Sequence, residues 1–91
     1  MQKSSAFILL DVRTTQEFQD KHIPGAILIP VQELENRAAA ELPNKDTHIF
    51  IYCRSGVRSA NAAKILVEKG YTQVFDFGGI INWPYNTATG N

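Results

Sequence analysis

The sequence Cys53-Arg54-Ser55-Gly56-Val57-Arg58-Ser59 joins an apolar run at residues 48–52 to a helical pattern at residues 60–69. It contains the only cysteine of the chain and two of its four arginines, and it contains no acidic residue. The pattern is typical of a strand that ends at a cysteine, passes through a tight turn with a glycine and enters a helix. Backbone N–H groups of such a turn converge on one point, and the positive end of the helix dipole faces that point. The stretch therefore predicts an anion-binding loop at the carboxyl end of a strand.

Cys53 is the predicted nucleophile of this loop. A thiol in this position loses its proton more easily, because the loop N–H groups and the arginines stabilise the thiolate. The alternative is that Cys53 is a small buried apolar side chain, as a lone cysteine at a strand end often is. The two nearby arginines favour an anion site, because arginine is poorly tolerated in a core. The residues predicted to surround the anion are Arg54, Ser55, Gly56, Val57 and Arg58.

The bulk composition indicates one small folded domain. The chain of 91 residues suffices for a single core, and 44% of its residues are hydrophobic. Nine basic and nine acidic side chains cancel, which gives no support for nucleic acid or an anionic membrane as a partner. One cysteine excludes an internal disulfide framework and a cysteine-rich zinc site, so no metal site is expected. No apolar run reaches the length of a membrane span, and the N-terminus lacks a signal-peptide pattern. Nothing in the sequence requires a dimer, so we expect a monomer.

Four apolar runs alternate with three helical patterns. The predicted strands are residues 6–10, 26–29, 48–52 and 73–77, and the predicted helices are residues 15–20, 31–42 and 60–69. Runs without polar alternation fit strands that are covered on both faces. We therefore predict an α/β fold of three layers, with a parallel sheet of about four strands, right-handed crossovers and helices on both faces. A single domain is expected over residues 1–91, with a core at 6–84 and a loose tail at 85–91.

Side-chain patterns predict how several of these elements pack. The spacing of Thr14 and Glu17 is that of a capping box at the start of the first helix. Gly78-Gly79 predicts a turn after the last strand, followed by one helical turn near residues 80–83. The expected buried faces are Val31, Leu34, Ala38 and Leu42 in the second helix and Ala62, Ala63, Leu66 and Val67 in the third.

The candidate functional residues all follow predicted strands. They are Asp11, Arg13, the loop from Cys53 to Arg58, and Gly78-Gly79. Ligands of open parallel sheets bind at the carboxyl ends of the strands, where the strand order reverses. We therefore expect these residues to gather at one edge of the sheet. Asp11 and Arg13 are expected to support the structure there, Arg13 by pairing with Glu17 and Asp11 by accepting N–H groups from neighbouring loops.

Three groups of residues resemble the signatures of rhodanese-type sulfurtransferases. The groups are Leu10-Asp11-Val12-Arg13 with Glu17-Phe18, His22-Ile23-Pro24-Gly25-Ala26 and Ile29-Pro30; then Tyr52 to Ser59; then Gly70-Tyr71, Val74, Gly78-Gly79 and Trp83. They occur in the order of that family and span residues 7–83. Larger members carry a further strand and helix before this point, so the resemblance implies a compact rhodanese-like fold with four main strands.

The resemblance also implies an activity. Cys53 would take a sulfane sulfur from a donor such as thiosulfate, release sulfite, hold a persulfide and pass the outer sulfur to a thiophilic acceptor such as cyanide or a thiol. The partners would be these small molecules alone, and the persulfide on Cys53 would serve in place of a cofactor. The compact form is similar to small periplasmic members of the family, so the periplasm is the expected compartment, with the cytoplasm as the alternative.

The residues supply physical reasons for each part of such a mechanism. A persulfide is anionic, so converging N–H groups would stabilise it as an oxyanion hole stabilises charge. Gly56 permits a turn that a Cβ would obstruct, and Asp11, Arg13 and Ser59 are expected to support the loop. Arg54 and Arg58 would orient a dianionic donor, and Arg58 is expected to contribute more because it lies inside the loop. His22 is expected to satisfy loop backbone rather than act as a base, and Trp83 to belong to the core or a pocket wall.

Two other functions share part of this pattern. Cysteine-dependent phosphatases and arsenate reductases also place a cysteine loop and an arginine between a strand and a helix, but five residues separate their cysteine from their arginine. Here four residues separate Cys53 from Arg58, and Ser59 has the phosphatase spacing. The shorter loop suits one sulfur atom better than a tetrahedral phosphate. A non-catalytic binding module is the third alternative, and the presence of Cys53 argues against it.

Overall fold

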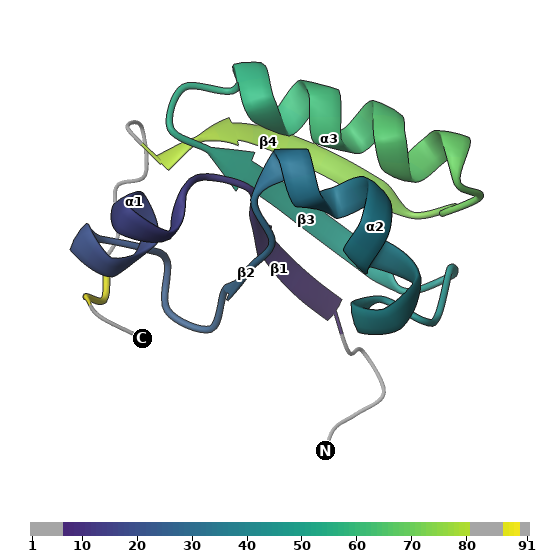
Figure 1. Cartoon of the computed structure of the whole chain (residues 1–91), viewed down its shortest axis with the longest axis horizontal. Coiled ribbons are helices and arrows are strands. Elements are labelled where there is room, and N and C mark those ends of the chain that lie inside the picture. The colour runs from purple at the N-terminus through teal and green to yellow at the C-terminus, as the bar shows by residue number, and fades with distance from the viewer. Residues whose placement is uncertain (1–6, 81–86, 90–91) are drawn as a thin grey trace.

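A computed structural model describes residues 7–80 and 87–89 of the chain (Figure 1). Its elements in chain order are β1 (Phe7–Asp11), α1 (Thr15–Asp20), β2 (Ile27–Leu28), α2 (Val31–Glu41), β3 (His48–Cys53), α3 (Val57–Glu68) and β4 (Val74–Gly79). The predicted alternation of strands and helices is confirmed. The α/β class and the four-stranded sheet are confirmed with it.

The sheet is parallel, and its strand order is β2-β1-β3-β4. The chain adds β2 on one side of β1 and then returns to place β3 on the other side, so the order reverses between β1 and β3. Asp11 at the end of β1 is in register with Tyr52 of β3, immediately before Cys53. The reversal therefore places the segments after Asp11 and after Cys53 side by side at the carboxyl edge, as the sequence predicts.

The main core lies between one face of the sheet and the helices α2 and α3, which Figure 1 shows together on that face. It is built from Leu10, Val12, Ile29, Leu34, Ala38, Leu42, Ile49, Ile51, Cys53, Ala62, Leu66 and Tyr71. The predicted buried face of α2 is confirmed. Val67 is an incorrect prediction in α3, because its side chain is 59% exposed. Ile65, which lies on the other side of Leu66, packs against the core instead.

The second face of the sheet has a smaller core. Ile23, Tyr52 and Ile80 are buried there, with Leu9 and Ala26 packed against them. Farther from the carboxyl edge, aromatic side chains pack against one another along this face but stay open to solvent, with Phe7 60% and Phe75 43% exposed. The two faces are therefore covered unequally, and the helices of the main core lie on one of them.

The end of β4 differs from its prediction. Gly78 and Gly79 were expected to form a turn, but β4 continues through both residues, and Gly79 pairs with Cys53. The register shifts between Ile51 and Tyr52, because Phe77 is an extra residue that forms a bulge. Gly78 has φ of +101°, which only glycine adopts easily, and this permits the bulge. The predicted helical turn around Trp83 lies outside the described residues.

The predicted loose tail also needs a correction at one described residue. Ala88 forms an isolated antiparallel bridge with His22. The N–H of His22 donates to the carbonyl of Ala88 at 2.8 Å, and the N–H of Ala88 donates back at 2.7 Å. Two backbone hydrogen bonds therefore fasten this part of the C-terminal segment beside the loop that follows α1.

Candidate active site

Cys53 is the last residue of β3, and the chain turns directly from it into α3. The residue is 1% exposed, and the N–H of Gly56 donates to Sγ at 2.9 Å. Gly56 precedes the first residue of α3 and has φ of +110°. A residue with a Cβ is strained at this φ, so the turn favours glycine. The predicted arrangement of strand end, turn and helix start around one sulfur atom is confirmed.

The pKa of the Cys53 thiol lies below its ordinary value. Burial of the sulfur raises the pKa, but hydrogen bonds outweigh burial. They come from the backbone N–H groups of Ser59, Gly56 and Ser55, together with an interaction of the Ser59 side chain. All of these groups belong to the loop or the first turn of α3. The loop therefore favours a thiolate at the position where the sequence predicts a nucleophile.

Arg58 is held by an acid from another element. Its Nη1 and Nη2 donate to Oε1 and Oε2 of Glu17 at 2.7 and 3.0 Å. The Arg58 hydrogen bonds lower the pKa of Glu17 to about 2, against an opposing effect of burial. The capping box is confirmed, because Glu17 also accepts from Thr14 while the Thr14 hydroxyl accepts from Glu17 N–H. Arg58 therefore links the loop that follows Cys53 to α1.

Arg13 was expected to pair with Glu17 and instead pairs with Asp11. Its Nη2 lies 2.7 Å from Asp11 Oδ2, and the side chains of Arg13 and Asp11 are 4% and 0% exposed. The backbone N–H of Arg13 also donates to Asp11 Oδ1 at 2.9 Å, so the N–H group that Asp11 accepts comes from its own segment and not from a neighbouring loop as predicted. The guanidinium lies over the ring of Tyr52 at 5.6 Å. Arg13 and Asp11 are two residues apart, so they form this ion pair without a contribution from α1. Glu17 of α1 is therefore available to pair with Arg58.

Ser59 connects Cys53 to a residue that the sequence did not single out. The Cys53 thiol lies 3.7 Å from Ser59 Oγ, and Ser59 Oγ donates to Asp76 Oδ1 at 2.7 Å. Asp76 Oδ1 also accepts from the N–H of Gly78 at 2.9 Å. Asp76 thereby fastens the first turn of α3 to the bulge in β4. Its sequence signal was weak, because an acid in a predicted strand is ordinarily a solvent-facing position.

Gly79 packs directly against the backbone of the loop that follows Cys53. A Cβ at this residue would collide with the carbonyl oxygen of Arg54 and the Cα of Ser55. The backbone of β4 and the backbone of the loop are therefore in direct contact. The sequence predicted Gly79 near the site, and the structure gives close packing rather than a turn as the reason for glycine.

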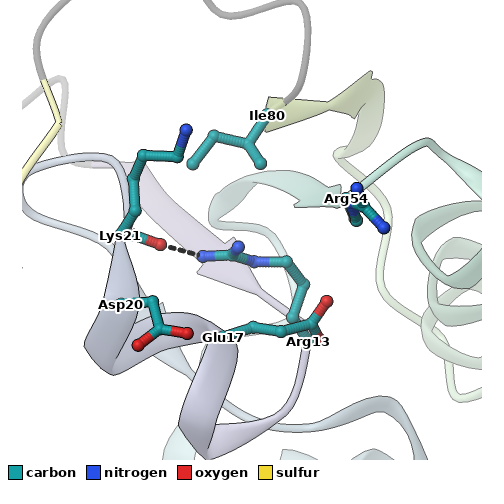
Figure 2. Close-up of a pocket in the computed structure, with 6 residues that line it drawn as sticks. All are labelled: Arg13, Glu17, Asp20, Lys21, Arg54 and Ile80. Atoms are coloured by element: carbon teal, nitrogen blue, oxygen red, sulfur yellow. Dashed lines mark hydrogen bonds between the residues drawn. The ribbon is translucent and has the colours of Figure 1, made fainter.

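A pocket of about 350 Å³ opens beside the loop. It is lined by Arg13, Glu17, Asp20, Lys21, Arg54 and Ile80 (Figure 2). Arg54 is exposed and, in the part of the chain that the structure describes, makes no ion pair. Val57 is 77% exposed at the start of α3. Of the two loop arginines, Arg54 is therefore the one whose charge is available to a ligand.

His22 has the role that the sequence predicts. Its Nδ1 lies 2.8 Å from the carbonyl oxygen of Phe18, and its ring stacks on Phe18 with centroids 3.8 Å apart. The residue is buried. Trp83, which was expected in the core or a pocket wall, lies outside the described residues.

No three histidine, cysteine, aspartate or glutamate residues within 7–80 and 87–89 are grouped as a metal site would require. No described helix has the length and apolar character that crossing a membrane requires.

The rhodanese-like domain family matches residues 1–84. The chain is 41% identical over 71 residues to the thiosulfate sulfurtransferase PspE of Escherichia coli strain K12, covering 78% of this chain and 68% of that protein. It is 42% identical over 77 residues to a sulfurtransferase of Allochromatium vinosum, covering 84% of this chain and 70% of that protein. A solved structure of a rhodanese with anions from E. coli matches with a TM-score of 0.87 at 36% identity, covering 93% of this chain and all of that one.

Proposed function

The chain belongs to the family of rhodanese-like domains, and we propose that it is a thiosulfate sulfurtransferase whose Cys53 carries the transferred sulfur as a persulfide. Relatives named as sulfurtransferases support the general reaction class. The observation that carries the specific proposal is the convergence of loop N–H groups on Cys53 Sγ, with Gly56 N at 2.9 Å. Such a site stabilises a thiolate before the reaction and an anionic persulfide during it.

The reaction has two displacements. The Cys53 thiolate attacks the outer sulfur of thiosulfate, a new S–S bond forms, and sulfite leaves with the electrons of the broken S–S bond. An acceptor such as cyanide then attacks the outer sulfur of the persulfide, and Cys53 leaves as a thiolate. The negative charge on the Cys53 side stays beside the same loop N–H groups throughout, which lowers the barrier of both steps.

The two loop arginines have different roles in this proposal. Arg58 is engaged by both carboxylate oxygens of Glu17, so it holds the start of α3 against α1. Arg54 is exposed at the pocket and free to attract an anionic donor. From the sequence we expected Arg58 to contribute more than Arg54 to donor binding. The contacts of Arg58 with Glu17 favour the opposite order.

The proposal extends to the surroundings of the reaction. We propose that transfer needs no metal or organic cofactor, that the partners are small sulfur donors and acceptors, and that the protein acts as a monomer without nucleic acid or membrane. The resemblance to compact family members supports a periplasmic location, and the cytoplasm is the alternative. Activity that survives extensive treatment with chelators, together with sedimentation of the protein as one chain, is the expected result.

A paired enzyme assay tests the proposed activity against the phosphatase and binding-module alternatives. Thiosulfate-to-cyanide transfer and aryl-phosphate hydrolysis are measured on one preparation, beside the variant Cys53→Ser. We expect transfer that is lost in the variant, with negligible phosphate hydrolysis, because the loop from Cys53 to Arg58 is one residue too short for a phosphatase. Hydrolysis that exceeds transfer and depends on Cys53 would replace the proposal with the phosphatase alternative.

A further inference from the structure

The pocket beside the loop contains a buried arginine whose hydrogen-bonding capacity is only partly used. Arg13 is 4% exposed, and it donates from Nε and Nη2 to Asp11 and from Nη2 to the carbonyl oxygen of Lys21. Its remaining nitrogen, Nη1, has no hydrogen-bond partner within residues 7–80 and 87–89. A buried N–H group without a partner costs free energy, and an acceptor on a ligand removes that cost.

Two more cations lie around this guanidinium. Figure 2 shows the side chains of Lys21 and Arg54 on opposite sides of Arg13, with Ile80 above it in the view. Neither Lys21 nor Arg54 forms a salt bridge with any residue that the structure describes. The positive charges of Lys21 and Arg54 are therefore available to an anionic ligand that contacts Arg13.

The acids of the pocket are engaged elsewhere. Glu17 is paired with Arg58, and Asp20 accepts from the side-chain amide of Gln16 at 3.0 Å. In Figure 2 both carboxylates lie below the Arg13 guanidinium, away from Ile80. The space between Lys21, Ile80 and Arg54 is therefore bordered by three cations and one apolar side chain.

The pocket is large enough for a small organic ligand. Its volume of about 350 Å³ falls within the range of roughly 300–1,000 Å³ that is usual for small-molecule sites, and it exceeds what thiosulfate or cyanide needs. A carboxylate is the common organic group that matches a guanidinium, and Ile80 offers an apolar contact to the carbon chain that bears it.

We propose that this pocket selects the sulfur acceptor, and that the preferred acceptor is a small organic thiol that carries a carboxylate. The carboxylate binds Nη1 of Arg13, between Lys21 and Arg54, while the thiolate faces the loop. This inference rests on the proposed sulfurtransferase function. The acceptor thiolate attacks the outer persulfide sulfur, a new S–S bond forms, and the bond to Cys53 Sγ breaks. Cys53 leaves as a thiolate, and any proton on the outer sulfur stays on that sulfur as it passes to the acceptor. The exchange consumes no oxidant or reductant.

The test separates acceptor choice from donor binding. The protein is loaded with sulfur from thiosulfate, freed of excess donor and mixed with mercaptopropionate, mercaptoethanol or cysteamine. These thiols have chains of similar length that end in a carboxylate, a hydroxyl and an ammonium group. Loss of the persulfide is followed by mass spectrometry in a single turnover. Each rate is expressed per thiolate and divided by the rate of the same thiol with a small persulfide in free solution.

We expect mercaptopropionate to react on the order of tenfold faster than mercaptoethanol, as one charge-assisted contact provides, and cysteamine to react slowest. Lys21→Gln and Arg54→Gln should each shrink this preference, whereas the control Lys64→Gln, an exposed residue outside the pocket, should preserve it. These variants change exposed side chains, so the test does not depend on replacing the buried Arg13.

The possible outcomes distinguish this inference from the function on which it rests. Equal corrected rates for the three thiols, or a preference for cysteamine, with normal formation and loss of the persulfide would overturn the acceptor assignment alone. A preference for mercaptopropionate that survives in both pocket variants would also overturn it. Failure of Cys53 to take up sulfur at all would contradict the sulfurtransferase proposal itself.

Discussion

Glu17 and Arg58 are separated by 41 residues in the chain, yet Oε1 of Glu17 lies 2.7 Å from Nη1 of Arg58. One carboxylate therefore completes the capping box of α1 and also restrains the helix that begins beside Cys53. The family signature at the N-terminal end and the cysteine loop are thus joined by a bidentate ion pair. This contact predicts a specific pH dependence of stability.

Replacing Glu17 with glutamine should flatten the acid side of the stability curve. The ion pair lowers the pKa of Glu17 in the folded protein from 4.5 to about 2. Its contribution to the free energy of unfolding is therefore complete above pH 4.5 and is lost as the pH falls towards 2. Urea unfolding at several pH values in this range should show a smaller decline for Glu17→Gln than for the wild type.

The partner variant provides the control for that measurement. Arg58→Gln should flatten the same pH range to a smaller extent, because the hydrogen bonds from Thr14 still lower the pKa of Glu17. The double variant should flatten it no further than Glu17→Gln, because that change already removes the ion pair. A curve for Glu17→Gln that runs parallel to the wild-type curve between pH 4.5 and 2 would show that the pair does not stabilise the fold.

Asp76 should position the nucleophile through Ser59. Asp76→Ala removes the acceptor of both the Ser59 hydroxyl and the Gly78 N–H, so the loop donors should lose alignment with Cys53. We expect sulfur transfer to fall about tenfold or more and the thiol pKa to rise relative to Asp76→Asn. Asp76→Asn keeps an oxygen that accepts both bonds and should retain most activity. The pH dependence of alkylation measures the pKa in both variants.

A matched aspartate at the other end of the sheet serves as the control. Asp46 accepts from the hydroxyl of Thr72 at 2.8 Å and also joins two loops, but it precedes the start of β3, whose opposite end carries Cys53. Asp46→Ala should leave transfer and the thiol pKa unchanged. Equal loss of activity in Asp76→Asn and Asp76→Ala, or no change of the thiol pKa between them, would remove Asp76 from this role.

Gly79→Ala should destabilise the protein through a collision. The new Cβ would meet the backbone of Arg54 and Ser55, so the loop or β4 must move. We expect a loss of about 2 kcal/mol or more in the free energy of unfolding, measured in urea, together with reduced transfer. Gly25→Ala is the comparison, because Gly25 has φ of +88° but open space around it. It should cost about 1–2 kcal/mol and leave transfer intact. The reverse ranking of transfer losses would contradict contact between β4 and the loop.

Local sequence patterns were sufficient to predict the fold and the turn that follows Cys53. The run before Cys53, the glycine after it and the helical pattern beyond specify a strand, turn and helix through neighbouring residues alone. The capping box of Thr14 and Glu17 is equally local. The alternation of such units then leaves few topologies, which is why the parallel sheet and the edge that carries the site were predictable.

Contacts between distant segments were not predictable in the same way. Arg13 and Arg58 both match Glu17 chemically, and only the three-dimensional arrangement shows that Asp11 takes Arg13 and leaves Glu17 to Arg58. The role of Asp76 depends on a bulge that shifts the register of β4. Val67 shows the limit of helical periodicity, because a rotation of one residue decides which side chain meets the core.

Intact-protein mass spectrometry shows whether Cys53 carries sulfur as a persulfide, as we propose. The protein is weighed at neutral pH before thiosulfate, after thiosulfate and after a chase with excess cyanide, beside Cys53→Ser. We expect a gain of one sulfur atom with thiosulfate, its removal by cyanide and no change of mass in the variant. An unmodified mass after thiosulfate, or a sulfur adduct that persists in Cys53→Ser, would contradict this proposal.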